Sequence, residues 1–353
     1  MGVDILNNTL EKMSDLVMAP RKYNQLLSDD TRHWFELINL VVLSSALALF
    51  GIATNIINVL VFYRQGLNTT VNISFTGLAV SDLCSLVTLL WFNICENPYF
   101  AKSDVPMAAS EFQHLTGGFP HACFTRITSW ITTYIAAERC LCMAFPLRIK
   151  EIISPRKATA VIVTIYLWMM ISLLPEYITV YIDWKWYPEV NKTLLGLKFT
   201  TDRHRVDGLS FLLYAVYMII SFFSVVVLTA ILFSKLKRKI EWRHGKASSV
   251  KPSESLTRRD KKTMRMVVVI AGVLIVTFMP QVIIFTVGFI EPEFSVVGKY
   301  VNFFFMSWSF CFVFDAANSS VSIILYYTMS SKYRLTFHEI FSERSGSRCI
   351  KNK

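Results

Sequence analysis

The chain has 353 residues, of which 53% are hydrophobic and 17% charged, and its formal net charge is +11. A soluble domain carries about 25% charged residues, so this composition indicates a membrane protein. The positive charge does not indicate nucleic-acid binding, because the sequence has no zinc-finger spacing and no RNA-recognition signature. Lys and Arg are also expected in loops that face anionic lipid.

Seven apolar runs follow one another along the chain. Each is long enough for a helix across a hydrocarbon core about 30 Å thick, which needs about 20 residues. Lipid offers no hydrogen bonds to the backbone, so such runs become helices. The fold class predicted is an all-α membrane protein with a seven-transmembrane helix bundle. The runs are Leu37–Tyr63, Val71–Cys95, Gly117–Met143, Ala158–Ile182, Leu209–Phe233, Met264–Phe289 and Val301–Tyr327.

The excess of Lys and Arg follows runs one, three, five and seven. The basic side of a membrane protein is cytoplasmic, so we expect an extracellular N-terminus and a cytoplasmic C-terminus. The predicted parts are an extracellular segment (1–36), a membrane domain (37–330), and a cytoplasmic amphipathic helix and tail (331–353). The apolar face of that helix, with Tyr333, Phe337, Ile340 and Phe341, is expected to lie on the inner leaflet. Sequons at Asn7 and Asn191 fall on the outside, where we expect glycosylation.

Short motifs stand in a fixed order within the runs. They are Gly51–Asn55, Leu78–Leu83, Glu138-Arg139-Cys140, Trp168 with Pro175, Phe278-Met279-Pro280 and Asn318–Tyr326. With these motifs the chain resembles class A (rhodopsin-like) G-protein-coupled receptors, and among them divergent invertebrate neuropeptide and chemosensory receptors. The resemblance implies a plasma-membrane receptor that binds an extracellular ligand and activates a heterotrimeric G-protein, with arrestin as a further partner.

The chain departs from the family pattern at several positions. Cys140 replaces the usual Tyr after Arg139, and Ser322 begins an element that lacks both the family's Asn and its Pro. His114 stands where the family has a Cys that bridges to the second outer loop, and residues 183–208 contain no Cys. Two other roles for cysteines are considered: a disulfide between Cys95 and Cys311, and palmitoylation of Cys349.

Asp82 lies in the middle of the second run. An ionisable residue within a span is by default a functional hypothesis. The resemblance assigns Asp82 to a sodium site with Asn55, Thr128, Asn318 and Ser319, and oxygen ligands of this kind suit a hard cation. The alternative is a neutral Asp82 that only forms hydrogen bonds with Asn55 and Asn318. No other cofactor is expected.

Arg139 ends the third run and keeps its charge in a protein, so it needs partners. Glu138 is adjacent. Asp260 lies 20 residues before Pro280, which is roughly 30 Å along a helix and places it at the same cytoplasmic face. Either Asp260 locks Arg139 in the inactive state, or it only offsets the neighbouring lysines. The resemblance also assigns activation roles to Phe278, Pro280 and Tyr326.

Arg126 lies roughly 20 Å outward from Arg139 at helical rise. A cation at that depth implies a buried counter-charge or a ligand carboxylate. Glu176 is the first candidate for a structural pair and Asp315 the second. The sequence leaves both the structural pair and the ligand contact open.

His121 lies near the outer mouth and is either a ligand contact or a polar residue satisfied within the protein. Asp315 is placed to face it. Further candidates for the pocket lining are Trp91, Gln281 and Tyr300. An amine receptor would have an Asp at the position of His121, and a retinal protein would have a Lys in the seventh run, but the sequence has neither.

A peptide is therefore the first ligand class that we expect, and a small chemosensory molecule is the second. A transporter or channel would show matching inverted halves, which the sequence lacks. The sequence also contains no catalytic triad arrangement, zinc-ligand spacing or phosphate loop, so no enzyme is expected.

Overall fold

A computed structural model describes residues 26–145, 148, 152–188, 190–206, 209–245, 258–296 and 298–350. Asn7 lies outside these residues. The side chains of Asp260 and Cys349 also lie outside the described part, so the expectations for them stay predictions.

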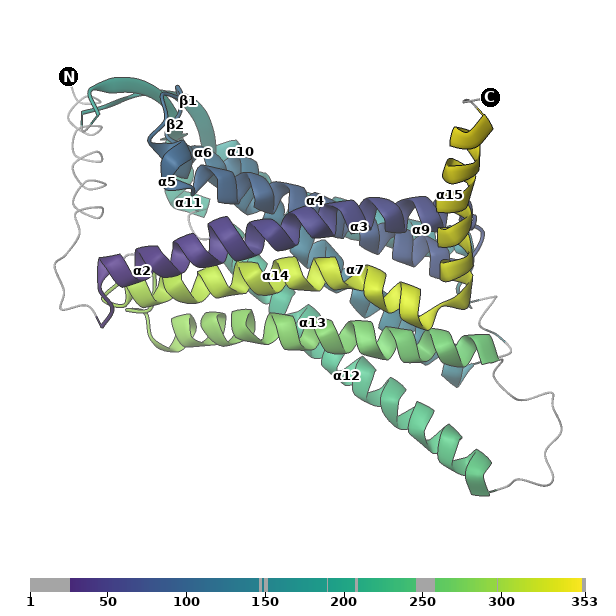
Figure 1. Cartoon of the computed structure of the whole chain (residues 1–353). Helices are drawn as coiled ribbons and strands as arrows, with labels where there is room; N and C mark the ends of the chain where they lie inside the picture. Colours follow the sequence, from purple (N-terminus) through teal and green to yellow (C-terminus); the bar gives the residue numbers. More distant parts are fainter. Residues whose placement is uncertain are drawn as a thin grey trace.

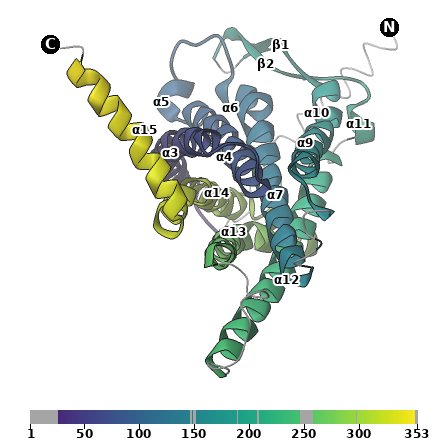
Figure 2. The ribbon, with the colours of Figure 1, turned by 90° about the vertical axis from the view of Figure 1, so that its right-hand side faces the viewer.

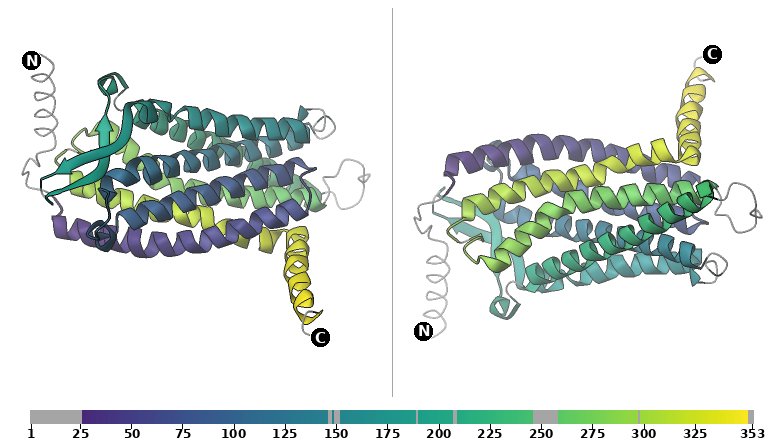
Figure 3. Two further views of the ribbon diagram at one scale, coloured as in Figure 1. Left: turned by 90° about the horizontal axis from the view of Figure 1, so that it is seen from above. Right: turned by 90° about the horizontal axis from the view of Figure 1, so that it is seen from below.

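Long helices run side by side along one axis, with a β-hairpin at one end and helix α15 across the other (Figure 1). Both further views show the same arrangement (Figure 3). The helical elements are α2 (Asp29–Glu36), a π-helical segment (Leu37–Ser44), α3 (Ser45–Arg64), α4 (Thr70–Cys95), α5 (Pro98–Ala101), α6 (Ala109–Gln113), a second π-helical segment (His114–Gly118), α7 (Phe119–Ala144), α9 (Pro155–Ile171), α10 (Leu174–Thr179), α11 (Arg203–Val206), α12 (Leu209–Gly245), α13 (Arg258–Ile290), α14 (Val301–Met329) and α15 (Ser331–Ile350). The strands are β1 (Val180–Tyr187) and β2 (Lys192–Phe199).

All seven predicted runs form helices, but several boundaries differ from the prediction. Helices α12 and α13 are longer than the predicted runs at the end opposite the hairpin. The first helix begins at Asp29, because the Ser28 side chain caps it by accepting the Thr31 N–H. Part of the segment expected to precede the bundle is therefore continuous with the first span. The fourth helical run ends at Thr179, and Val180–Ile182 belong to β1, where pairing with β2 satisfies their backbone.

Six helical segments in the described part are long and apolar enough to cross a membrane. They are Asp29–Arg64, Thr70–Cys95, Pro155–Thr179, Leu212–Arg238, Lys262–Ile290 and Val301–Met329. Helix α7 is not among them, although it runs with them through the bundle (Figure 2). It contacts α4, α9, α12 and α13. A helix surrounded in this way presents little surface to lipid, so it tolerates the threonines, serines and charges that lower its hydropathy.

The largest core cluster joins α3, α4, α7 and α14 around Phe62, Phe75, Ile127 and Tyr326. Outward-facing apolar side chains elsewhere, such as Leu167 and Phe223, are more than half exposed. An apolar exterior of this extent suits a hydrocarbon environment.

Helix α15 packs its apolar face mainly against the bundle rather than away from it. Tyr333 is 1% exposed, and its hydroxyl donates to Asn58 Oδ1 at 2.6 Å. Its ring contacts those of Phe62 and Tyr326. The expectation that this face lies on the inner leaflet is therefore wrong for Tyr333, while Phe341 stays 41% exposed. The reason is the buried amide of Asn58, which needs a partner and is reached by the Tyr333 hydroxyl.

The two cysteines considered as a pair, Cys95 and Cys311, are both buried and both free. The candidate disulfide between them is therefore not formed. The hairpin at this end is held by hydrogen bonds instead. Leu195 on β2 donates its N–H to Pro106 O at 2.9 Å and accepts the Ala108 N–H at 2.8 Å, while the Leu197 N–H donates to Glu111 Oε2 at 2.8 Å.

The hairpin pairs Val180 with Phe199 at its base and Tyr187 with Lys192 beside its turn. On its exposed face Lys198 Nζ lies 2.8 Å from Asp183 Oδ2, and this hydrogen bond holds the pKa of Asp183 below its ordinary value. Asn191 is exposed at the turn, with a φ of 52° that Asn tolerates better than most residues. The predicted glycosylation site is thus accessible.

Removing the carboxylate of Glu111 should loosen the hairpin. A buried N–H bonded to a charged acceptor loses about 1–3 kcal/mol when that acceptor is removed. We expect Glu111→Ala to speed amide hydrogen exchange at Leu197 and along β2. Lys198→Ala is the matched control, because an exposed ion pair contributes only about 0–1 kcal/mol. Equal exchange rates in wild type and Glu111→Ala would contradict this role.

Candidate functional site

A cavity of about 220 Å³ opens among the helices at the hairpin end of the bundle. Helices α7, α12, α13 and α14 supply most of its wall. Four of the predicted ligand-binding residues line it, namely His121, Arg126, Gln281 and Asp315. Its other lining residues are Phe92, Gln113, His114, Gly118, Phe119, Ala122, Ser210, Tyr214, Trp308 and Phe312.

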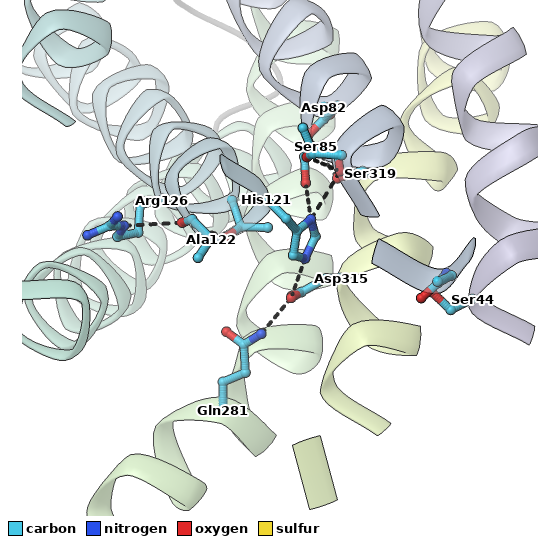
Figure 4. Close-up of polar contacts among 12 residues, drawn as sticks. Ser44, Asp82, Ser85, His121, Ala122, Arg126, Gln281, Asp315 and Ser319 are labelled. Carbon is cyan, nitrogen blue, oxygen red and sulfur yellow. Dashed lines mark hydrogen bonds and ion pairs between the residues drawn. The ribbon is translucent and has the colours of Figure 1, made fainter. Parts of the chain in front are cut away.

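His121, Gln281 and Asp315 meet in one polar cluster (Figure 4). Asp315 Oδ2 lies 3.4 Å from His121 Nε2 and accepts a hydrogen bond from Gln281 Nε2 at 2.6 Å. The other ring nitrogen of His121 lies 3.0 Å from the Ser85 carbonyl oxygen. The predicted approach of Asp315 to His121 is confirmed. Asp315 Oδ1 and Gln281 Oε1 are buried without a partner in the described part of the chain.

The expected pair between Arg126 and Glu176 is wrong. Glu176 Oε2 lies 2.9 Å from Nη1 of Arg203, which follows the hairpin. The alternative partner, Asp315, is engaged by His121 and Gln281 instead. Arg203 was not among the expected partners, because the whole hairpin separates it from Glu176 in the sequence.

Arg126 itself is 2% exposed. Its Nε donates to the Ala122 carbonyl oxygen at 3.1 Å, and its guanidinium carbon lies 4.9 Å from the centre of the Tyr214 ring. Its Nη1 has no hydrogen-bond partner among the described residues. Arg126 therefore lines the cavity as a buried cation supported by an aromatic face.

Three expected lining residues lie elsewhere. Trp91 donates its indole N–H to Thr116 Oγ1 at 2.8 Å and packs against Phe100 and Phe112. Tyr300 precedes α14 and packs in a separate aromatic cluster. Glu176 points to Arg203, as described above, so none of the three lines the cavity.

Several lining residues were missed that helical spacing could have found. Trp308 and Phe312 lie seven and three positions before Asp315, and therefore share its face of α14. Ser210 and Tyr214 are four positions apart on α12. Without a polar reference residue on that helix, their spacing alone did not show which face points inward.

Asp82 lies below the cavity, where Thr128 Oγ1 donates to its Oδ1 at 2.8 Å and Ser319 Oγ does so at 3.1 Å. A space of about 20 Å³ beside it, also lined by Asn318, is large enough for one water-sized particle. The expected contact between Asn55 and this carboxylate is not formed. The Asn55 amide donates to the carbonyl oxygens of Gly51 and Ser319, because these lie nearer in the bundle.

Arg139 is buried at the other end of α7. Its Nη2 lies 2.6 Å from Glu138 Oε1, which also accepts the hydroxyl of Thr70 on α4. The adjacent acid is thus a confirmed partner, whereas the contact with Asp260 stays a prediction. Phe278 packs against Phe222 of α12. Tyr326 is 1% exposed, and its hydroxyl has no partner in the described residues.

The chain is similar in sequence to a family of seven-transmembrane receptors and to individual receptors. The family model "Serpentine type 7TM GPCR chemoreceptor Srw" matches residues 42–344. The growth hormone secretagogue receptor type 1 of Homo sapiens is 25% identical over 356 residues, covering 95% of this chain and 91% of that protein. The same receptor from Oryctolagus cuniculus is 25% identical over 341 residues, covering 92% and 88%. The N-arachidonyl glycine receptor of Bos taurus is 22% identical over 317 residues, covering 89% and 87%.

The order of motifs in seven helical runs, the polar groups along α7 and a family match over most of the chain lead to one conclusion. The chain is a multi-pass membrane receptor of the G-protein-coupled class, and it belongs to the Srw family of serpentine seven-transmembrane chemoreceptors.

Proposed function

We propose that the cavity of about 220 Å³ at the hairpin end is the agonist site of this receptor. The observation that carries the proposal is the convergence of partly unsatisfied polar groups in one apolar-walled cavity. Pockets of this kind, with a few polar groups that fix orientation, are the usual form of a ligand site. An agonist acts only through its higher affinity for the active helix arrangement.

A peptide is the first ligand class for this site. The similarity to growth hormone secretagogue receptors, over nearly the whole length of both chains, supports it. A small chemosensory molecule is the second class, and the description of the matched family supports that reading. We place the receptor in the plasma membrane with the hairpin end outside, because the basic loops lie at the opposite end. Arrestin is a further proposed partner.

A library of peptides and small molecules, applied to cells that express the receptor with a promiscuous G-protein, tests the agonist site. Ala122→Phe and Ser210→Phe would fill the cavity from two helices, and should abolish the response at matched surface level. A response that both variants retain would place the agonist elsewhere. A ligand-evoked current without added G-protein would favour the transporter or channel alternative.

Arg139 is the residue we assign to G-protein coupling. We expect Arg139→Ala to reach the cell surface and to lose agonist-driven nucleotide exchange, because the guanidinium is needed where the inner helix ends open. Glu138→Gln should instead raise the signal without agonist, since it weakens the only ion pair that the described residues give to Arg139. Nucleotide exchange in membranes measures both effects. Full exchange by Arg139→Ala would contradict the assignment.

Sodium is a candidate modulator at Asp82, where a carboxylate and hydroxyl oxygens line a space for one small particle. We expect agonist affinity in wild type to fall when sodium chloride replaces N-methylglucamine chloride. Asp82→Asn should remove that dependence, because it removes the charge. Asn55→Ser is the control, since Asn55 does not contact Asp82 and the sodium effect should persist. Equal sodium dependence in Asp82→Asn and wild type would leave Asp82 a hydrogen-bonding residue only.

A further inference from the structure

Arg126 is the one residue of the cavity whose charge the described part of the chain leaves without an acidic partner. It is 2% exposed, so bulk water screens its charge little. An arginine stays protonated in proteins. A buried charge without a counter-charge is costly and persists where it serves function.

The acids nearest in the fold are already engaged. Glu176 forms its ion pair with Arg203 at 2.9 Å. Asp315 accepts from Gln281 at 2.6 Å and faces His121 at 3.4 Å. In Figure 4 the Arg126 guanidinium lies apart from this cluster, and its Nε donates to the Ala122 carbonyl oxygen on the same helix. The cation is therefore held in place by a carbonyl oxygen and the Tyr214 ring, and neither neutralises it.

Seven polar side-chain atoms of the lining residues are buried without a partner in the described part of the chain. On the wall formed by α7 and α12, Arg126 Nη1 and Ser210 Oγ are hydrogen-bond donors without a partner among the described residues. On α13 and α14, Gln281 Oε1 and Asp315 Oδ1 are acceptors in the same condition, and the indole N–H of Trp308 is a donor. Gln113 Oε1 and His121 Nε2 complete this set. The rest of the lining is largely aromatic.

We propose that the agonist carries a carboxylate, which Arg126 and Ser210 bind, and an N–H donor a few bonds away, which faces Gln281 and Asp315. This chemistry is that of an amino acid acylated or extended at its nitrogen, so it has two sources. One is the free C-terminal residue of a peptide, and the other is a small N-acyl amino acid. The inference rests on the proposed function, because it requires that this cavity be the agonist site.

The test compares acids with their amides. Short peptides with a free C-terminus and a set of N-acyl amino acids are each paired with the same compound amidated, and agonist-driven nucleotide exchange is measured. We expect active compounds to be acids, with at least about a tenfold loss of potency on amidation, since an arginine–carboxylate contact is among the stronger hydrogen bonds. Activity confined to the peptides or to the acyl amino acids identifies the source.

Variants tie that preference to the residue. Arg126→Gln should bring the acid-to-amide potency ratio to about one, whereas Arg126→Lys should keep part of it through its charge. Arg203→Lys is the matched control at the half-buried arginine that pairs with Glu176, and its ratio should equal that of wild type. Equal potency of acids and amides on wild type, or a preference that survives Arg126→Gln, would overturn the inference.

A failure of the charge and a failure of the site give different results. If acids and amides are equally potent on wild type and both lose activity on Ala122→Phe, the cavity is the agonist site but does not recognise a carboxylate. If Ala122→Phe and Ser210→Phe respond to the compounds as wild type does, the cavity is not the agonist site.

Stability without any agonist gives an independent arm, which decides if no compound acts. Arg126→Leu should raise the melting temperature of the purified full-length receptor by about 2 °C or more, because it removes an uncompensated charge. Arg203→Leu should lower it by stranding Glu176. A lower melting temperature for Arg126→Leu would show that the protein itself supplies the counter-charge, and would overturn the inference.

Discussion

Helix α7 carries polar and charged side chains through the middle of a water-excluding bundle, and each must find a partner there or remain costly. Several hydrogen bonds between α7 and its neighbouring helices follow from this constraint. Thr128 donates to Asp82 on α4, and Ser129 to Ser221 on α12. His121 joins Ser85 on α4 to Asp315 on α14. The partners of α7 thus fix the positions of its neighbours.

Both arginines of α7 keep an N–H without a partner among the described residues, and they lie toward opposite ends of the helix. Arg126 faces the cavity at the hairpin end, with a donor free. Arg139 lies at the opposite end of the helix, held by its sequence neighbour Glu138. A packed bundle has few alternative arrangements, so a ligand that engages one end can bias which arrangement the other end adopts. The structure supplies both groups on one rigid element.

A polar chain also compensates for the missing Asn and Pro of the seventh span. Ser319 bonds to Asp82 through its hydroxyl, and its carbonyl oxygen accepts from Asn55. Asn58 in turn donates to Asn55 and accepts the Tyr333 hydroxyl of α15. The helix after the bundle is therefore hydrogen-bonded to the same network as the buried carboxylate. At the other end, backbone pairing and Glu111 hold the hairpin where the family uses a disulfide.

The sequence by itself determined the class, the seven helical runs and the residues whose charge or polarity is out of place in a membrane. Hydropathy, loop charge and motif order are local properties, and a buried Asp82, Arg126 or Arg139 is costly wherever it lies. The contact of Arg139 with Glu138 also followed, because the two are neighbours in the chain.

Only the tertiary structure decided the partners of the remaining groups. Glu176 was expected to pair with Arg126, because both lie within predicted spans. The hairpin instead brings Arg203 next to Glu176, and these two form the ion pair. Tyr333 was expected at the lipid surface, yet its hydroxyl reaches Asn58. Trp91 has the depth of a pocket residue but the wrong rotation about its helix, and Tyr300 lies before the start of α14. Pairing between distant segments and helix rotation depend on how all the side chains fill one interior together, and hydrophobic periodicity is weak in helices that are apolar on most sides.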